Sequence, residues 1–372
     1  MTTVEIAVIG TGGIAAQHLE HITANPRFKL TAVCDVDRKR AEEVGSKYGV
    51  PAFYDYEELL AKRTPAAVVV ATPHFFHPPI AIAALNRGLH VLVEKPIAVQ
   101  VKDASKMISA YEAARRSNGR LVFATMFMLR SVGYWKRVKE ILDAGELGRI
   151  VRASWIVTDW FRSQRYFDTG GWRATWHGEG GGALLNQCPH NLDLYQWYFG
   201  MPQRVTAIAA LGKYHKIEVE DEVTAIFQHA NGMIGHFIAS TAESPGTNRL
   251  EIVGENGRLL VEKDTVTLDR NSQSMLESIR SSTERFPAIP HTEEILQTVN
   301  DERTAHRRTL DNFADAILDG AAPIAPAVEG YASLSLANAV MLSALEKESI
   351  GFPLDEERYA RLLDGLIAGS KT

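Results

Sequence analysis

Residues 7–15, AVIGTGGIA, follow on an apolar run and bring three small residues into G-x-G-x-x-A spacing. Gly10 permits a tight turn, Gly12 lets the backbone approach a pyrophosphate, and Ala15 lets the next helix pack closely on the strand. The segments on either side are consistent with a strand–turn–helix unit, because EIAVIG is typical of a buried strand and GIAAQHLEHITA of a helix. The stretch predicts a dinucleotide site, with an ordinary glycine-rich turn as the alternative.

The next strand-like run, KLTAVCD, ends in Asp35. A carboxylate there suits a ribose 2′-OH and repels a 2′-phosphate, which favours NAD, while Arg38 keeps NADP open as an alternative. Thr72 is expected to hydrogen-bond ribose or phosphate, and His77 to cap the helix that follows. The other residues predicted to bind the cofactor are Gly13, Ile14, Pro73, Glu94 and Lys95.

Length and composition indicate a two-domain globular protein. The 372 residues exceed what one hydrophobic core of about 250–300 residues holds. A net charge of −5 offers no general attraction to nucleic acid or anionic lipid, so neither is an expected partner. With two cysteines, no signal peptide and no apolar stretch of about 20 residues, we expect a cytoplasmic protein that neither spans nor binds a membrane.

The order of apolar runs changes near residue 125. Before it, strand-like runs alternate with helical patterns, which predicts a doubly wound parallel sheet in an α/β fold over residues 1–125. A helix over 132–144 is followed by strands that succeed one another, which predicts an α+β domain with an open, mainly antiparallel sheet over residues 126–372. The polar segment 270–303 is expected to be an extended, lid-like loop.

A second cluster, HVLVEKPIA, places Glu94, Lys95 and Pro96 at the carboxyl end of a predicted strand. Side chains there face the cofactor crevice of a doubly wound fold. A lysine shielded from water beside a positively charged nicotinamide would have its pKa lowered toward the range useful for proton transfer. The alternative is a surface lysine paired with Glu94.

A third cluster lies in GEGGGALLNQCPHNLDLYQWYFG, residues 178–200. Asn186, His190, Asp193 and Trp197 follow helical spacing and would share one face. Because Pro189 disfavours a helical residue before it, the helix is expected to kink or begin there. Asn186 and His190 could converge on a ligand, with Asp193 orienting the imidazole, although a lone histidine beside aromatic residues is often structural.

Between these clusters, residues 158–182 interleave aromatic residues with arginines. Aromatic faces that pack on C–H surfaces, beside planar hydrogen-bond donors, suit a polyol. The residues predicted to bind substrate in this segment are Trp160, Arg162, Trp172 and Arg173. A core or a subunit interface is the alternative for part of the segment, and the acidic net charge argues against nucleic-acid stacking.

A metal centre is not expected, because no His, Cys or carboxylate spacing is typical of one. The acidic stretch EVEDE, residues 218–222, is interpreted as a solvated turn before a strand.

Taken in order, the G-x-G-x-x-A turn, EKP at 94–96 and GGGALLNQCPHNLD at 180–193 resemble the glucose–fructose oxidoreductase/inositol dehydrogenase (Gfo/Idh/MocA) family over nearly the whole chain. The resemblance implies a Rossmann domain, a second domain whose open sheet often mediates oligomerisation, and a proton-transfer pair at Lys95 and His190. Many members carry Asp where this chain has Asn186. An amide cannot act as an acid or base at neutral pH, so Asn186 is expected to orient the substrate hydroxyl.

The resulting hypothesis is an NAD-dependent dehydrogenase that moves a hydride between nicotinamide and a ring carbinol of a sugar, glycoside, anhydrosugar or inositol. Lys95 would carry the proton, and His190 and Asn186 would bind the alcohol. We expect a small carbohydrate or cyclitol as substrate and a homodimer or homotetramer. The alternatives are a glycosidase or lyase that oxidises its sugar transiently, and a non-catalytic NAD-binding sensor.

Overall fold

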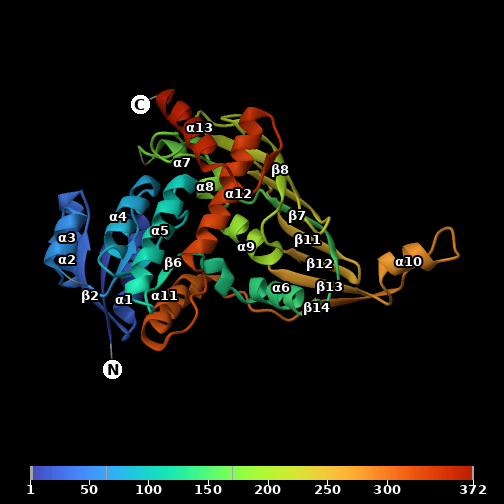
Figure 1. Cartoon of the computed structure of the whole chain (residues 1–372), viewed down its shortest axis with the longest axis horizontal. Coiled ribbons are helices and arrows are strands. Elements are labelled where there is room, and N and C mark those ends of the chain that lie inside the picture. The colour runs from blue at the N-terminus through green and yellow to red at the C-terminus, as the bar shows by residue number, and fades with distance from the viewer. Residues whose placement is uncertain (1–2, 64, 170, 371–372) are drawn as a thin grey trace. The chain divides into compact units, whose positions relative to one another are not determined.

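The computed structural model describes residues 3–63, 65–169 and 171–370, which form two compact units (Figure 1). The first unit contains Met1–Ser131 and Glu302–Ser335, and the second contains Val132–Asp301 and Leu336–Thr372. We predicted one division at residue 125. The chain instead leaves the first unit after Ser131 and returns to it through Glu302–Ser335.

A six-stranded parallel sheet organises the first unit, with the order β3-β2-β1-β4-β5-β6. Its strands are β1 (Val4–Ile9), β2 (Phe28–Cys34), β3 (Ala52–Phe53), β4 (Ala67–Val70), β5 (His90–Val93) and β6 (Phe123–Thr125). The sequence predicts five of them, from the runs EIAVIG, KLTAVCD, AAVVVAT, HVLVEKP and RLVFATM, and does not predict the two-residue edge strand β3. The order reverses between β1 and β4, and such a switch point is where doubly wound sheets bind ligands.

Helices cover both faces of this sheet. They are α1 (Gly13–Ala24), α2 (Arg38–Tyr48), α3 (Tyr56–Lys62), α4 (His77–Leu85), α5 (Val101–Ser117) and α11 (Glu302–Asp319), with short 3-10 turns at His74–Phe76 and Met128–Ser131. The chain moves from β1 to β2 and from β4 to β5 in opposite directions along the sheet. Because such connections are right-handed, α1 and α4 lie on opposite faces.

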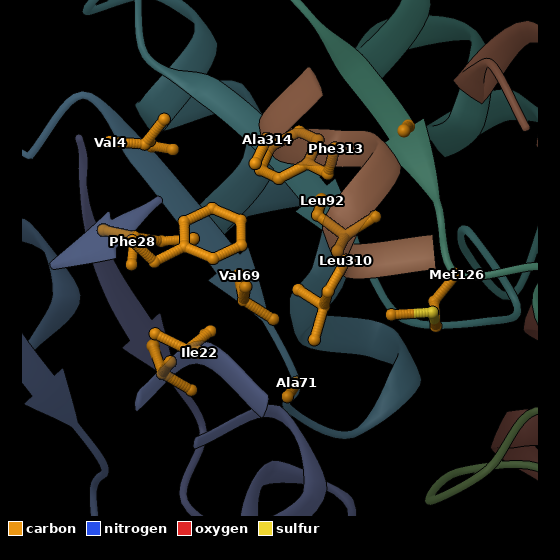
Figure 2. Close-up of a cluster of buried hydrophobic side chains, with 14 of the residues drawn as sticks. Val4, Ile22, Phe28, Val69, Ala71, Leu92, Met126, Leu310, Phe313 and Ala314 are labelled. Carbon is orange, nitrogen blue, oxygen red and sulfur yellow. The ribbon is translucent and has the colours of Figure 1, made fainter. Parts of the chain in front are cut away.

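Helix α11 completes the core of the first unit although it follows the second unit's long segment in sequence. Its buried residues Leu310 and Phe313 belong to the same apolar cluster as Leu19 of α1 and Val69 of β4. Figure 2 shows Leu310 and Phe313 gathered beside the strand residue Leu92. The six-stranded parallel sheet therefore depends on a helix from the last fifth of the chain.

The second unit is built on a nine-stranded sheet with the order β14-β13-β12-β11-β7-β10-β9-β8-β15 in the described residues. These strands are β7 (Ile150–Val157), β8 (Arg204–Leu211), β9 (Glu220–Gln228), β10 (Ile234–Ser240), β11 (Asn248–Gly254), β12 (Gly257–Glu262), β13 (Thr265–Asn271), β14 (His291–Leu296) and β15 (Ile350–Gly351). Among the described strands only β7 and β10 pair in parallel, so the sheet is mainly antiparallel, as predicted.

The helices of the second unit include a four-residue helix in the glycine-rich segment. They are α6 (Gly133–Asp143), α7 (Gln164–Asp168), α8 (Ala183–Asn186), α9 (Pro189–Phe199), α10 (Met275–Ser281) and α13 (Glu356–Ala368), with the second half of α12 (Ala327–Glu346). The prediction of a lid-like loop over 270–303 was wrong in part. Its residues 291–296 form the edge strand β14, which pairs with β13, and α10 extends beyond these strands (Figure 1).

One helix corrects the expectation that no apolar stretch could span a bilayer. By length and composition α12 is apolar enough to do so, with a mean hydropathy of 1.2 over its most apolar window. However, 67% of that window is buried inside the fold, which is the burial of a core helix.

Truncating Phe313 tests the contribution of α11. Phe313→Ala should lower the free energy of unfolding of the first unit by about 3–5 kcal/mol, because it removes a fully buried aromatic ring from a packed core. Hydrogen exchange at β1, β4 and β5 measures this stability. In the control Phe286→Ala the ring is 83% exposed, so the change should stay within about 0.5 kcal/mol. Equal losses in the two variants would contradict the packing described.

Candidate active site

The glycine turn after β1 has the shape that a dinucleotide needs. Gly10 has φ of +92°, and a Cβ there would lie 2.5 Å from the carbonyl oxygen of Ala71, so only glycine fits. A Cβ at Gly12 or Gly13 would meet no atom of the described residues within 4 Å, which leaves the backbone open on that side. Ile14 is 39% exposed at the start of α1. These features confirm the turn predicted from the sequence.

Asp35 follows β2 and is held by donors from three residues. It accepts hydrogen bonds from the backbone and hydroxyl of Thr11 at 2.8 and 2.9 Å, from the backbone of Asp37 at 2.9 Å and from Arg40 at 2.8 Å. Burial by itself raises the pKa of Asp35, but the hydrogen bonds from Arg40, Asp37 and Thr11 lower it below its usual value. The sequence alone did not predict that Thr11 and Arg40 would donate hydrogen bonds to Asp35. Arg38 instead stacks over Tyr54, 4.7 Å from the ring centre.

His77, the first residue of α4, joins two segments rather than capping this helix as we predicted. Its buried ring contacts the carbonyl oxygens of Thr72 at 2.8 Å and Pro96 at 2.9 Å, and no side-chain cap precedes α4. Burial lowers its pKa, so at neutral pH the ring donates to one of the two carbonyls. Thr72 Oγ1 is buried without a hydrogen-bond partner among the described residues, which suits a cofactor hydroxyl or phosphate beside Pro73.

Glu94 is buried. It is the first residue after β5, and Lys95 is the next residue in the chain. Its Oε1 lies 2.7 Å from Nε2 of His18 on α1, and its Oε2 accepts the backbone N–H of Lys95 at 3.1 Å. Burial raises the pKa of Glu94, but the hydrogen bond from His18 and the charges around the carboxylate together lower it below its usual value. Of the alternative, a surface Lys95 paired with Glu94, the structure shows that Glu94 itself is only 6% exposed and that the charge of Lys95 acts on its carboxylate.

His306 of α11 completes a buried group with His18 and Glu94. Nitrogen and oxygen atoms of the three side chains lie within 4.8 Å of one another, a distance compatible with a metal ion. The hydrogen bond between His18 and Glu94 accounts for that pair without an ion. Burial lowers the pKa of His306 to about 3, so its ring is neutral at neutral pH. Sequence spacing could not predict this group, because its members come from three distant segments.

In the second unit, the expected helix over Asn186 to Trp197 is broken. Asn186 ends α8, two residues separate it from α9, and Pro189 is the first residue of α9, as the restriction before proline predicts. His190 follows at the second position of α9. Asp193 is buried one turn later and accepts a hydrogen bond from Gln196 at 3.2 Å, a partner that we did not predict.

The interpretation of EVEDE as a solvated turn was wrong. Glu220 and Asp221 are 1% and 0% exposed at the start of β9. Glu220 accepts the N–H groups of Gly182 at 2.8 Å and Leu184 at 2.9 Å, so it positions the turn into α8. Burial raises the pKa of Glu220 to about 7 despite these bonds. A Cβ at Gly182 would lie 2.1 Å from the Glu220 carbonyl oxygen, which explains the glycine.

The aromatic segment forms an alternating stack of rings and guanidinium groups. Arg162 lies 5.2 Å from the ring centre of Trp160 and 4.8 Å from that of Tyr166. Arg173 lies 5.1 Å from the ring centre of Tyr166 and 4.7 Å from that of Trp172. Such contacts contribute about 0.5–1 kcal/mol each at exposed sites and hold the donors in planes beside the rings. The structure thus brings together the four residues that we predicted for substrate, with Tyr166 between the arginines.

Not every aromatic residue of this segment belongs to the stack. Phe167 and Trp176 are 9% and 4% exposed and lie in the interior of the second unit, as the alternative interpretation anticipated for part of the segment. Tyr166 connects the stack to the glycine-rich turn, because its hydroxyl lies 3.4 Å from Oδ1 of Asn186. Lys95 belongs to the first unit, whereas Asn186 and His190 belong to the second.

Two family models match the chain. The model described as oxidoreductase family, NAD-binding Rossmann fold, matches residues 4–123, and the Gfo/Idh/MocA C-terminal domain matches residues 135–260. An uncharacterised oxidoreductase of Synechocystis sp. is 30% identical over 277 residues, which is 70% of this chain and 72% of the relative. The inositol 2-dehydrogenase of Rubrobacter xylanophilus is 26% identical over 345 residues, 91% of this chain and 90% of the relative.

A solved structure agrees with these matches. The WlbA dehydrogenase from Bordetella pertussis, in complex with NADH and UDP-GlcNAcA, has a TM-score of 0.79 and 26% identity, covering 95% of this chain and 100% of that chain. The turn at Gly10, Asp35 and the buried hydroxyl of Thr72 fit a dinucleotide of the kind that this relative binds. The chain therefore belongs to the Gfo/Idh/MocA family of oxidoreductases, and its first unit has that family's NAD-binding Rossmann fold.

Proposed function

We propose that the protein is an NAD-dependent dehydrogenase acting on a ring carbinol of a sugar, glycoside, anhydrosugar or inositol. The observation that carries the proposal is the alternating stack of rings and guanidinium groups, which Tyr166 connects to Asn186. Ring faces pack on the C–H surface of a pyranose or cyclitol, and planar donors bind its hydroxyl groups. The similarity to an inositol 2-dehydrogenase over 91% of the chain supports the same substrate class.

In the proposed reaction, Lys95 takes the proton of the substrate hydroxyl during oxidation and returns it during reduction. Bound NAD supplies the acceptor for the hydride. His190 hydrogen-bonds the same hydroxyl or its neighbour. Asn186 orients the alcohol through its amide, which neither gains nor loses a proton near neutral pH.

We propose a preference for NAD over NADP because of Asp35 and Arg40. The carboxylate would repel a 2′-phosphate. Arg40, the nearest cation, is already engaged at 2.8 Å by Asp35 and is therefore not available to a phosphate. The preference thus depends on one ion pair.

We also propose a cytoplasmic location. Both cysteines, Cys34 and Cys188, are buried, and they form no disulfide in the part of the chain that the structure describes. Burial raises the pKa of Cys34 to about 12, which keeps it in the unreactive thiol form. A protein with such cysteines and NAD as cofactor suits a reducing compartment.

We propose further that two copies of the chain pair through one face of the nine-stranded sheet. In β8 and β9, Ile208 and Ile226 are 76% and 41% exposed. Strand register places Ile238 and Ile156 of β10 and β7 on the same face, because Ile208 and Ile238 both oppose Thr224 and Ile156 opposes Ile238. An antiparallel sheet with an apolar stripe on its uncovered face is suited to packing on a second sheet of the same kind.

The proposed activity is tested with purified protein, NAD and a panel of inositols, aldoses, glycosides and anhydrosugars, while reduced nicotinamide is followed by its absorbance. At least one compound should produce NADH. The rate with Lys95→Ala should be about 10²–10⁴-fold lower, the usual loss for a general acid or base. NAD affinity should change little.

The matched control for this assay is Lys106→Ala, which removes an exposed lysine of the same unit that pairs with Asp103 on the surface. A near-normal rate with Lys95→Ala would contradict the role of Lys95. Sugar cleavage without accumulation of NADH would indicate the glycosidase or lyase alternative, and NAD binding with no turnover would indicate the sensor.

Replacing Asp35 tests the cofactor preference. Asp35→Ser should narrow or reverse the ratio of kcat/KM for NAD over NADP, because it removes the repulsion and releases Arg40 for a 2′-phosphate. The double variant Asp35→Ser with Arg40→Ala should gain less NADP activity than the single one, since the released cation is then missing. An unchanged ratio in Asp35→Ser would show that this carboxylate does not distinguish the cofactors.

The assembly is tested by placing charges on the sheet face. Ile208→Glu combined with Ile226→Glu should convert a dimer or larger oligomer to monomers in sedimentation velocity, because buried unpaired carboxylates cost several kcal/mol. Ile279→Glu on α10 is the matched control, since that side chain is 73% exposed outside the face. A monomeric parent protein, or an oligomer that survives both substitutions, would rule out this interface.

A further inference from the structure

Glu179 lies in the glycine-rich segment and was not among the residues predicted from the sequence. Its side chain is buried, with 2% of the residue exposed. Oε2 accepts the backbone N–H of Ala174 at 2.8 Å. Oε1 accepts a hydrogen bond from the amide nitrogen of Asn186, and the Arg173 guanidinium lies 3.7 Å from the same oxygen. The carboxylate therefore links two donors. The backbone N–H of Ala174 has a fixed direction, whereas the side-chain amide of Asn186 can rotate.

A second path closes a loop through the same residues. Arg173 donates to the phenol oxygen of Tyr166 at 3.1 Å, and the Tyr166 hydroxyl lies 3.4 Å from Oδ1 of Asn186, to which it donates. A guanidinium only donates and a carboxylate only accepts, so the two charged ends determine the direction of each bond in the loop. The Asn186 amide consequently has one orientation, with its nitrogen toward Glu179 and its oxygen toward Tyr166.

We propose that Glu179 is a positioning residue that holds the amide of Asn186, and that positions 179 and 186 work only as a pair of one carboxylate and one amide. This inference rests on the proposed function, in which Asn186 orients the substrate alcohol. A carboxylate at 186 beside Glu179 would bring two negative charges within hydrogen-bond distance, and one of them would have to take up a proton. An amide at 186 is thus the residue type that Glu179 requires.

Glutamine cannot replace Glu179 in this arrangement. The two carboxylate oxygens accept from Ala174 and Asn186, whereas a glutamine has one oxygen and a donating nitrogen. If the oxygen faces Ala174, the nitrogen opposes the Asn186 nitrogen, and the asparagine amide must flip away from its bond with Tyr166. The opposite orientation leaves the buried N–H of Ala174 opposite a donor.

Exchanging the two groups should restore the loop. In Glu179→Gln combined with Asn186→Asp, the glutamine oxygen accepts from Ala174 and its nitrogen donates to the new carboxylate. That carboxylate also accepts from Tyr166. The pair again holds one negative charge, and each donor again faces an acceptor, so the two substitutions should compensate each other.

The experiment compares the parent with Glu179→Gln, Asn186→Asp, the double variant, Asn186→Ala and the control Glu243→Gln, an exposed glutamate of the same unit. The first readout is the side-chain amide NMR signal of Asn186, in protein labelled with ¹⁵N-asparagine. The second is kcat and KM for the compound of the sugar and inositol panel with the highest kcat/KM. Unfolding in urea reports the stability of each variant.

We expect Glu179→Gln to move the Asn186 amide signals and to lower kcat/KM by roughly 5- to 100-fold, mostly through kcat, as for one lost buried hydrogen bond. The kcat/KM of the double variant, relative to the parent, should exceed the product of the two relative values of the single variants by about fivefold or more. Two results would overturn the positioning role. One is a shift of the Asn186 amide signal that is no larger in Glu179→Gln than in Glu243→Gln. The other is a double variant whose loss of kcat/KM equals the product of the losses in the single variants.

The two proposals fail differently. If Asn186→Ala leaves kcat/KM unchanged while Glu179→Gln still moves the amide signals, Glu179 holds the amide but Asn186 does not orient the alcohol, and the proposed function loses that step. If Asn186→Ala lowers kcat/KM while Glu179→Gln changes only the stability, the proposed function stands and the positioning role is wrong.

Discussion

Buried carboxylates that accept backbone N–H groups hold most of the segments of the candidate site. Asp35 accepts from Thr11 and Asp37, Glu94 from Lys95, Glu179 from Ala174, Glu220 from Gly182 and Leu184, and Asp221 from residues 213–215. Removing such a charge from water costs several kcal/mol unless its oxygens are hydrogen-bonded. The interior therefore tolerates these groups only with their donors in place, which gives the glycine-rich loops a definite geometry.

The fold was largely predictable because its signals are local. Helix α1 has the bounds of the pattern GIAAQHLEHITA, since a glycine turn precedes it and apolar residues recur at helical spacing. The break between α8 and α9 followed from Pro189. The return of the chain into the first unit was not predictable. The sequence of α11 has the pattern of an ordinary amphipathic helix, and this pattern does not indicate which hydrophobic core the helix joins. Strand β14 was hidden for a similar reason, since an exposed edge strand has no buried face to produce an alternation.

The candidate site shows the same difference between features with a local sequence signal and features that depend on distant segments. The turn at Gly10 and the grouping of aromatic residues and arginines were predictable as local geometry, because each has a typical composition or spacing, and their roles stay predictions. Glu179, Glu220 and the group of His18, Glu94 and His306 were missed or misread. Their partners are backbone groups or side chains from distant segments, and charge in a sequence normally signals exposure to solvent. A buried carboxylate shows itself only when the donors around it are known.

The split of the first unit into two sequence segments has a consequence for synthesis of the chain. The parallel sheet emerges from the ribosome early, but the face that receives Leu310 and Phe313 stays uncovered until the whole of Val132–Asp301 has been translated. At about 5–20 residues per second that delay is roughly 10 to 30 seconds. During this interval the nascent chain presents an apolar sheet surface to the cell, so aggregation or chaperone binding competes with folding until α11 arrives.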